Sequence, residues 1–259
     1  MRRCILRLHD KFQAGIEKMF FGGRSTRFSR HLTFIIGNII LMVVIFYILL
    51  NTIAYDWTGQ LYPVTAGFRL DFIFGGLDNA IPFIPEMVIF YEFLFYGMVI
   101  FTMVFFGFID NEKGYALGWS LVLINAIAIV IYIFFPVSTY SWRQDLLADP
   151  IVGNFWADMV YSIFATDTPF NCFPSLHAAV STICFYTWFQ YSKIRIQRVT
   201  KLMAIVTFIL AVGIILSTLF IKQHYIADEI AGVLLALGVG KLLFSYLWKP
   251  FKPAGPSVS

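Results

Sequence analysis

Two histidines with polar neighbours are the residues of this 259-residue chain whose types and spacing suggest catalysis. His224 precedes Asp228 by four residues, so on a helix or in a tight turn the carboxylate can accept a hydrogen bond from one imidazole nitrogen. That bond fixes the tautomer and raises the basicity of the other nitrogen, as a nucleophile or a general base requires. Thr218 and Lys222 have the same spacing and can face one ligand together.

The second histidine, His177, lies in the run Pro174-Ser175-Leu176-His177, which has the form of a helix start. A proline in the first turn costs no hydrogen bond, because the N–H groups of that turn have no partner within the helix. These N–H groups and the positive end of the helix dipole can together bind an anion. Ser175 adds a hydroxyl and His177 adds a proton donor to this predicted anion site.

Together, these residues offer a nucleophile, an acid for the leaving group and cations for the oxygens of a transferred phosphoryl group. The sequence contains no GxSxG motif, HExxH motif or Walker loop, and no cluster of metal-ligating carboxylates. We therefore expect phosphoryl transfer without a metal or another cofactor. The structural alternative is a plain Pro-Ser helix start, a snorkelling Lys222 and an Asp228 that caps a helix.

The elements that must position these residues are membrane-spanning helices. Hydrophobic residues make up 59% of the chain, charged residues only 13%, and the mean hydropathy is +0.76. This composition excludes a soluble globular domain, a disordered chain and a nucleic-acid binder. Stretches long and apolar enough to cross a bilayer are predicted at about 32–54, 84–108, 115–137, 175–191, 202–222 and 227–247. Because helices are the structure that satisfies the backbone in lipid here, residues 32–248 are expected to form an all-α catalytic domain, a six-transmembrane-helix bundle.

The distribution of positive charge predicts the orientation of these helices. Residues 1–31 carry eight Lys and Arg between apolar residues spaced three and four apart, which predicts a basic amphipathic helix on the cytoplasmic face; a solvated basic tail is the alternative. All Lys and Arg but Arg69, Arg143 and Lys222 fall on the side of the N-terminus, so both termini, including a flexible tail at 249–259, are expected in the cytoplasm.

With that orientation, both histidines lie at outer membrane ends, on the periplasmic, extracellular or lumenal side. The outer loop 138–174 is long enough to fold over a site between them. Cys172 is expected to be accessible from the outside, because it lies three residues before a span.

The sequence resembles the type 2 phosphatidic acid phosphatase superfamily, also called lipid phosphate phosphatases. Members have six spans and the motifs K-x6-R-P, P-S-G-H and S-R-x5-H-x3-D. The run that ends at His177 resembles the second motif, with Leu176 in place of glycine. Ser217, His224 and Asp228 match the third at full spacing, with Thr218 in place of arginine.

The first motif is degraded. Arg143 is present, but Gln144 follows it where the motif has proline, and Pro136 stands where the motif has lysine. Two motif cations are therefore missing from this chain. We expect Lys222, one turn past Thr218, to restore one of them.

The resemblance implies a role for each matching residue. His224 is the implied nucleophile that forms a phosphohistidine, Asp228 orients it, and His177 protonates the leaving alcohol. The implied phosphate-binding residues are Arg143, Ser175 and Ser217, to which we add Thr218 and Lys222. Superfamily members need no metal.

We therefore expect an integral-membrane phosphatase that hydrolyses a lipid phosphate monoester or pyrophosphate at an extracytoplasmic site. Residues 222–225 and 78–85 also resemble a branch related to inositolphosphorylceramide and sphingomyelin synthases, in which the headgroup passes to a lipid alcohol. A headgroup phosphotransferase is thus the alternative, and a non-catalytic lipid-phosphate transporter the second alternative.

The expected partners are the lipid phosphate and membrane lipids, without nucleic acid. The sequence predicts neither the oligomeric state nor the lipid headgroup. For Glu92 it favours a structural hydrogen bond between helices, and it gives Glu86 no defined role.

Overall fold

The computed structural model describes residues 67–109, 111–195 and 197–247, together with Lys11 and Ile36. Within these residues every regular element is a helix, and two isolated bridges are the only strand-like pairings. The predicted all-α class is confirmed for this part of the chain. The predicted N-terminal segment 1–31, first span 32–54 and tail 249–259 otherwise lie outside the described residues.

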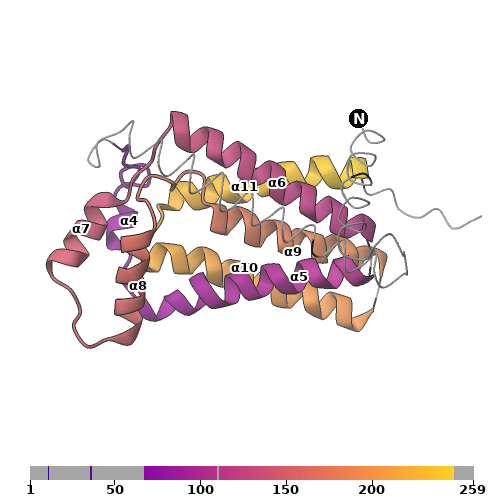
Figure 1. Cartoon of the computed structure of the whole chain (residues 1–259), viewed down its shortest axis with the longest axis horizontal. Coiled ribbons are helices and arrows are strands. Elements are labelled where there is room, and N and C mark those ends of the chain that lie inside the picture. The colour runs from indigo at the N-terminus through magenta and orange to yellow at the C-terminus, as the bar shows by residue number, and fades with distance from the viewer. Residues whose placement is uncertain (1–10, 12–35, 37–66, 110, 196, 248–259) are drawn as a thin grey trace, which may run out of the picture.

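Five long helices run side by side and form a bundle (Figure 1). They are α5 (Phe95–Ile109), α6 (Asn111–Phe134), α9 (Leu176–Ile194), α10 (Arg198–Phe220) and α11 (Ile226–Leu247). A 3-10 turn, η2 (Pro85–Met87), and a π-helical turn, η3 (Ile89–Leu94), lead directly into α5. These helices lie at five of the six stretches that hydropathy predicts as spans.

Three helical stretches among the described residues are long and apolar enough to cross a membrane. They are Pro85–Ile109, Lys113–Phe134 and Arg198–Phe220. Polar residues along α9, including the buried Ser181, Thr182 and Thr187, reduce its apolar character. The six-span bundle therefore stays a prediction, whereas the all-helical architecture is established.

Helix α9 lies at the centre of the bundle and packs against α5, α6, α10 and α11. Its fully buried Ala178, Ala179 and Ser181 are small, which lets neighbouring backbones approach closely. The closest approach is at Gly232 of α11, where a Cβ would lie 2.3 Å from the carbonyl oxygen of Ser175. The first turns of α9 and α11 are therefore held against each other.

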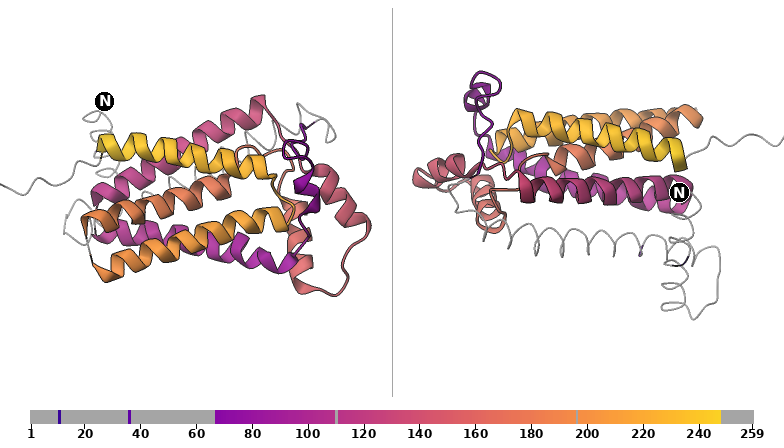
Figure 2. Two further views of the ribbon diagram at one scale, coloured as in Figure 1. Left: turned by 180° about the vertical axis from the view of Figure 1, so that it is seen from behind. Right: turned by 90° about the horizontal axis from the view of Figure 1, so that it is seen from above.

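One end of the bundle is covered by short helices. These are α4 (Leu77–Ala80), α7 (Tyr140–Ala148) and α8 (Phe155–Thr166), and they lie across the ends of the long helices (Figures 1 and 2). Main-chain hydrogen bonds from Phe68 to Pro136 and from Thr139 to Pro169 join the segments between them. The predicted long outer loop 138–174 thus contains two helices that cover the end where α9 and α11 begin.

The expectation that Cys172 is accessible from the outside is wrong. Its side chain is only 1% exposed, because the segment before α9 packs beneath α7 and the α10–α11 turn. Cys184, within α9, is also buried. Neither thiol can report the orientation of the protein.

An exposed position reports the orientation better. Val152, between α7 and α8, is 89% exposed. In a Cys4→Ser background, we expect Val152→Cys to react with a membrane-impermeant maleimide in intact cells, because the predicted orientation puts this end outside. The matched control is Arg195→Cys, between α9 and α10 at the opposite end, which should react only after permeabilisation. The reverse pattern would invert the predicted orientation.

Candidate active site

The turn between α10 and α11 carries the predicted nucleophile. Helix α10 ends in a Schellman motif, in which the N–H groups of Lys222 and Gln223 donate to the carbonyl oxygens of Leu219 and Thr218. Lys222 occupies the left-handed position of this motif with a φ of 60°, where glycine is usual. A non-glycine residue there costs on the order of 1 kcal/mol. This tight ending directs His224 back towards the start of α9.

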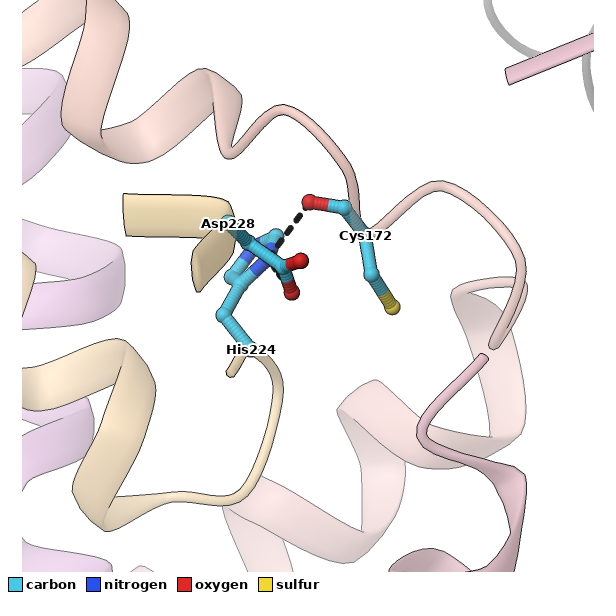
Figure 3. A group of neighbouring side chains, drawn as sticks. All are labelled: Cys172, His224 and Asp228. Atoms are coloured by element: carbon cyan, nitrogen blue, oxygen red, sulfur yellow. Dashed lines mark hydrogen bonds and ion pairs between the residues drawn. The ribbon is translucent and has the colours of Figure 1, made fainter. Parts of the chain in front are cut away.

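His224 is held by two acceptors on the same ring nitrogen. Its Nδ1 lies 2.9 Å from the main-chain oxygen of Cys172 and 3.5 Å from Oδ2 of Asp228 (Figure 3). Because a carbonyl oxygen only accepts, Nδ1 carries the proton, and in the neutral ring Nε2 has the free lone pair. The Tyr225 N–H donates to the same Asp228 oxygen, at 2.8 Å, and fixes the carboxylate in place.

The surroundings of His224 also change its proton affinity. Burial alone would lower the pKa of His224, but the hydrogen bond with Asp228 and the negative charges of Glu229 and Asp228 outweigh it. The net effect raises the pKa of His224 above its ordinary value of 6.5. Nε2 is therefore a stronger base than in an exposed histidine, and its lone pair is lost at a higher pH on acidification.

His177 lies in the first turn of α9, facing the other histidine. Ser175 caps the helix by accepting from the Ala178 N–H at 3.2 Å, and the Ser175 N–H donates to the Asp228 carbonyl oxygen. The His177 ring stacks on Tyr91 with centroids 4.1 Å apart. The ring centroids of His177 and His224 lie 6.2 Å apart. Both predicted catalytic histidines thus belong to one site.

Arg143 of α7 is buried beside this site. Its guanidinium donates to the main-chain oxygens of Asp167, at 2.6 Å, and of Thr168, at 3.4 Å. It also donates to Oε1 of Gln223, the residue before His224. Arg143 therefore connects α7, the segment after α8 and the α10–α11 turn.

Two donors of this group have no partner in the part of the chain that the structure describes. Nε of Arg143 and Nε2 of Gln223 are both buried and make no hydrogen bond with the described residues. Buried donors are nearly always paired, and leaving one unpaired costs about 1–3 kcal/mol. Two such donors on hydrogen-bonded neighbours, next to His224, are suited to a ligand rich in acceptor oxygens, such as a phosphate.

A comparison with models of protein families shows which family the chain belongs to. A family model described as the PAP2 superfamily matches residues 68–242, which include all the residues of the candidate site. The chain belongs to the PAP2 superfamily. No curated protein and no solved structure matched in the other two comparisons. Membership and the apolar helices together indicate an integral membrane protein with phosphatase or phosphotransferase activity.

The third PAP2 motif departs from its pattern at Thr218, where this chain lacks the arginine. Oγ1 of Thr218 lies 2.7 Å from the Ile215 carbonyl oxygen and 2.8 Å from Oε1 of Glu229. The Thr218 hydroxyl thus donates towards two oxygens, one in its own helix and one on the carboxylate of α11. Glu229 is 3% exposed, so a second buried acidic side chain lies near His224 and contributes to the negative charge that raises its pKa. Sequence reasoning missed Glu229 because no motif includes it.

Ser217, the first residue of that motif, is also buried. Its hydroxyl donates to the Ile214 carbonyl oxygen at 2.6 Å, within α10. The oxygen of that hydroxyl can still accept, but its proton is committed to the helix. Ser217 therefore has no free hydroxyl proton to donate to a phosphate in this structure.

Lys222 contacts different elements. Its ammonium donates to the Asp78 carbonyl oxygen at 3.0 Å and lies 4.6 Å from the centre of the Trp142 ring. The Asp78 carboxylate accepts from the Ile226 N–H at 2.7 Å and caps α11. In this structure Lys222 therefore secures the turn to α4 and α7, and direct phosphate binding by Lys222 stays a prediction.

A metal site is the alternative use of the same residues. Cys172, His224 and Asp228 offer donor atoms within 4.8 Å of one another. However, the carbonyl oxygen of Cys172 faces the imidazole, whereas Sγ points away from it (Figure 3) and lies 3.2 Å from the Pro169 oxygen. Burial also raises the pKa of the Cys172 thiol, while metals bind the thiolate. The donor chemistry therefore fits a metal poorly and fits a histidine–carboxylate pair well.

The unpaired amide of Gln223 generates a prediction. We expect Gln223→Leu to reduce kcat/KM for a lipid phosphate by ~10²–10³-fold, as for other well-placed donors to a transition-state anion. Gln144→Leu, at an exposed glutamine next to Arg143, is the matched control and should retain activity. Gln223→Glu keeps an acceptor for Arg143 but loses the donor, so it should also be impaired. Full activity of Gln223→Glu would show that Gln223 only anchors Arg143.

Proposed function

We propose that this PAP2 superfamily member is a metal-independent lipid phosphate phosphatase that works through a phosphohistidine on His224. The observation that carries the proposal is the arrangement of this ring: Nδ1 is used by Cys172 and Asp228, which leaves the lone pair of Nε2 for attack. Such an orienting acceptor on one nitrogen activates the other as a nucleophile. The substrate is a lipid phosphate monoester or pyrophosphate, and the site faces the periplasm, the lumen or the exterior.

The proposed first step transfers the phosphoryl group to the protein. Nε2 of His224 forms a bond to phosphorus while the bond from phosphorus to the lipid oxygen breaks, and His177 gives its proton to the departing oxygen. The positive charge that develops on His224 is stabilised by Asp228. In the second step water attacks phosphorus, His177 takes a proton from that water, and the electron pair of the P–N bond returns to Nε2.

The proposed phosphate contacts come from three directions. Nε of Arg143 donates from the covering helix α7, Nε2 of Gln223 donates from the α10–α11 turn, and free N–H groups donate from the first turn of α9. Three further predicted residues act indirectly, without a direct bond to phosphate. The hydroxyls of Ser217 and Thr218 shape the end of α10, and Lys222 holds the turn in place and adds positive charge.

A headgroup phosphotransferase is the second candidate. It shares the first step, but a lipid alcohol replaces water in the second. One observation favours it: residues 78–85 and 222–225, which resemble the inositolphosphorylceramide synthase branch, contact each other through Lys222 and Asp78. The second alternative, a lipid-phosphate transporter, needs no nucleophile and gives no reason for the arrangement of His224.

One assay tests the function directly. Purified protein in detergent with EDTA should release phosphate from a panel of lipid phosphates and form an acid-labile phosphoprotein. His224→Ala should abolish both, whereas His31→Ala, outside the family match, should change neither. His177→Ala should slow turnover about 10²–10⁴-fold, least for good leaving groups. Near-normal turnover of His224→Ala would exclude the mechanism, and a new phosphodiester lipid would favour the phosphotransferase.

The pH dependence follows from the raised pKa of His224. Attack requires the unprotonated Nε2, so kcat/KM should fall as the pH decreases through this pKa, with an acid limb above pH 6.5. Asp228→Asn removes the carboxylate while burial persists, so the pKa of His224 should fall. The acid limb should then move to lower pH while the plateau rate decreases. An unmoved limb in a pH profile of Asp228→Asn would show that another group controls it.

A further inference from the structure

A groove of about 510 Å³ lies between α8 and the η3–α5 segment, outside the contacts described above. Its polar lining is Glu92, Ser162 and Thr166, and its apolar lining includes Phe93, Tyr96 and Ile163. Phe93 is 58% exposed and Tyr96 46% exposed, so this wall faces outward from the bundle. Because Glu92 follows the start of a membrane-spanning helix by one to two turns, the groove is accessible to lipid near the bilayer surface.

The carboxylate in this groove has no partner among the described residues. Glu92 makes no hydrogen bond or ion pair with them, so the interhelical hydrogen bond expected from the sequence is not formed within this part of the chain. An ionisable group at membrane depth is costly unless it is paired, and such groups usually mark a binding function. Glu92 is therefore suited to a cationic ligand.

The opposite wall adds only acceptors. The hydroxyl of Ser162 donates to the Asp158 carbonyl oxygen of its own helix at 2.9 Å. Its proton is thus used, and its oxygen faces a ligand as an acceptor. Among the residues that the structure describes, no Lys, Arg or His lines the groove. A carboxylate and a hydroxyl oxygen without a cation repel a phosphate and attract an ammonium group, which has three donors.

Both walls are adjacent in sequence to residues that contact the candidate active site. On one side, Tyr91 precedes Glu92 in η3 and stacks on His177. On the other side, Thr166 is followed by Asp167, whose carbonyl oxygen accepts from Arg143. A lipid whose phosphate lies at Arg143 and His177 can therefore extend from these residues towards the groove.

We propose that the groove binds the substrate lipid and that Glu92 recognises an ammonium group close to the phosphate. The inference rests on the proposed function and specifies its substrate class: a phosphorylated lipid with a free amine near the phosphate, as in a phosphorylated sphingoid base. Phosphatidic acid, which has no donor beside its phosphate, is the poorer substrate. The groove holds the amine and Arg143 holds the phosphate, so each charge has its own partner.

A matched pair of lipids tests this inference. Sphingosine 1-phosphate and its N-acetylated form differ in the charge of the amine, so the wild-type protein should prefer the free amine by about tenfold to a hundredfold in kcat/KM, the typical value of a hydrogen bond to a charged group. Glu92→Gln should abolish this preference by slowing the free-amine substrate alone. Glu86→Gln, at an exposed acid outside the groove, should retain the preference.

Further measurements separate this proposal from its alternatives. Ser162→Ala, on the covering helix, should weaken the preference in the same direction even if Glu92→Gln folds poorly. Binding of the two lipids to His224→Ala tests the amine site without turnover, so a failure of the proposed chemistry is distinguishable. Two outcomes would overturn the proposal: equal rates for both lipids in the wild type, or an unchanged preference in a folded Glu92→Gln variant. Either would indicate that bulk lipid or another part of the chain occupies the groove.

Discussion

The hydrogen bond from His224 to the main-chain oxygen of Cys172 is the interaction on which the site depends. It joins the α10–α11 turn to the segment before α9, and it places the ring proton on Nδ1. The bond forms only because α9 and α11 begin side by side, which the absence of a side chain at Gly232 permits. The packing of α9 against α11 thus places a main-chain oxygen where it accepts the Nδ1 proton, and this contact determines the tautomer of a buried imidazole.

The long helices and the principal histidines are predictable from the sequence for a physical reason. Bilayer thickness dictates the length of an apolar run, so stretches such as 202–222 lie close to the observed α10 (Arg198–Phe220). Equally, the four-residue spacing of His224 and Asp228 brings the ring in the turn after α10 to 3.5 Å from the carboxylate in the first turn of α11. The thickness of the apolar bilayer is sufficient to predict the helices, and local spacing is sufficient to predict the histidine–carboxylate pair.

The rest depends on contacts between distant segments. Glu229 belongs to no pattern, and the run 222–225 gives Gln223 no role of its own, so only unpaired buried atoms distinguish these two residues. Lys222 has the charge that a phosphate site needs, but its contact with Asp78 lies 144 residues away in the chain. The burial of Cys172 follows from how the loop 138–174 folds, and periodicity carries no information about that folding.

The unpaired donors of Arg143 and Gln223 also affect the end of the catalytic cycle. Under the proposed function these donors bind oxygens of the phosphate itself, not of the lipid, so they hold the inorganic product as well as the substrate. Departure of the product returns two buried donors to an unpaired state, at about 1–3 kcal/mol for each. Phosphate release is therefore an uphill step, and an enzyme built in this way is subject to product inhibition.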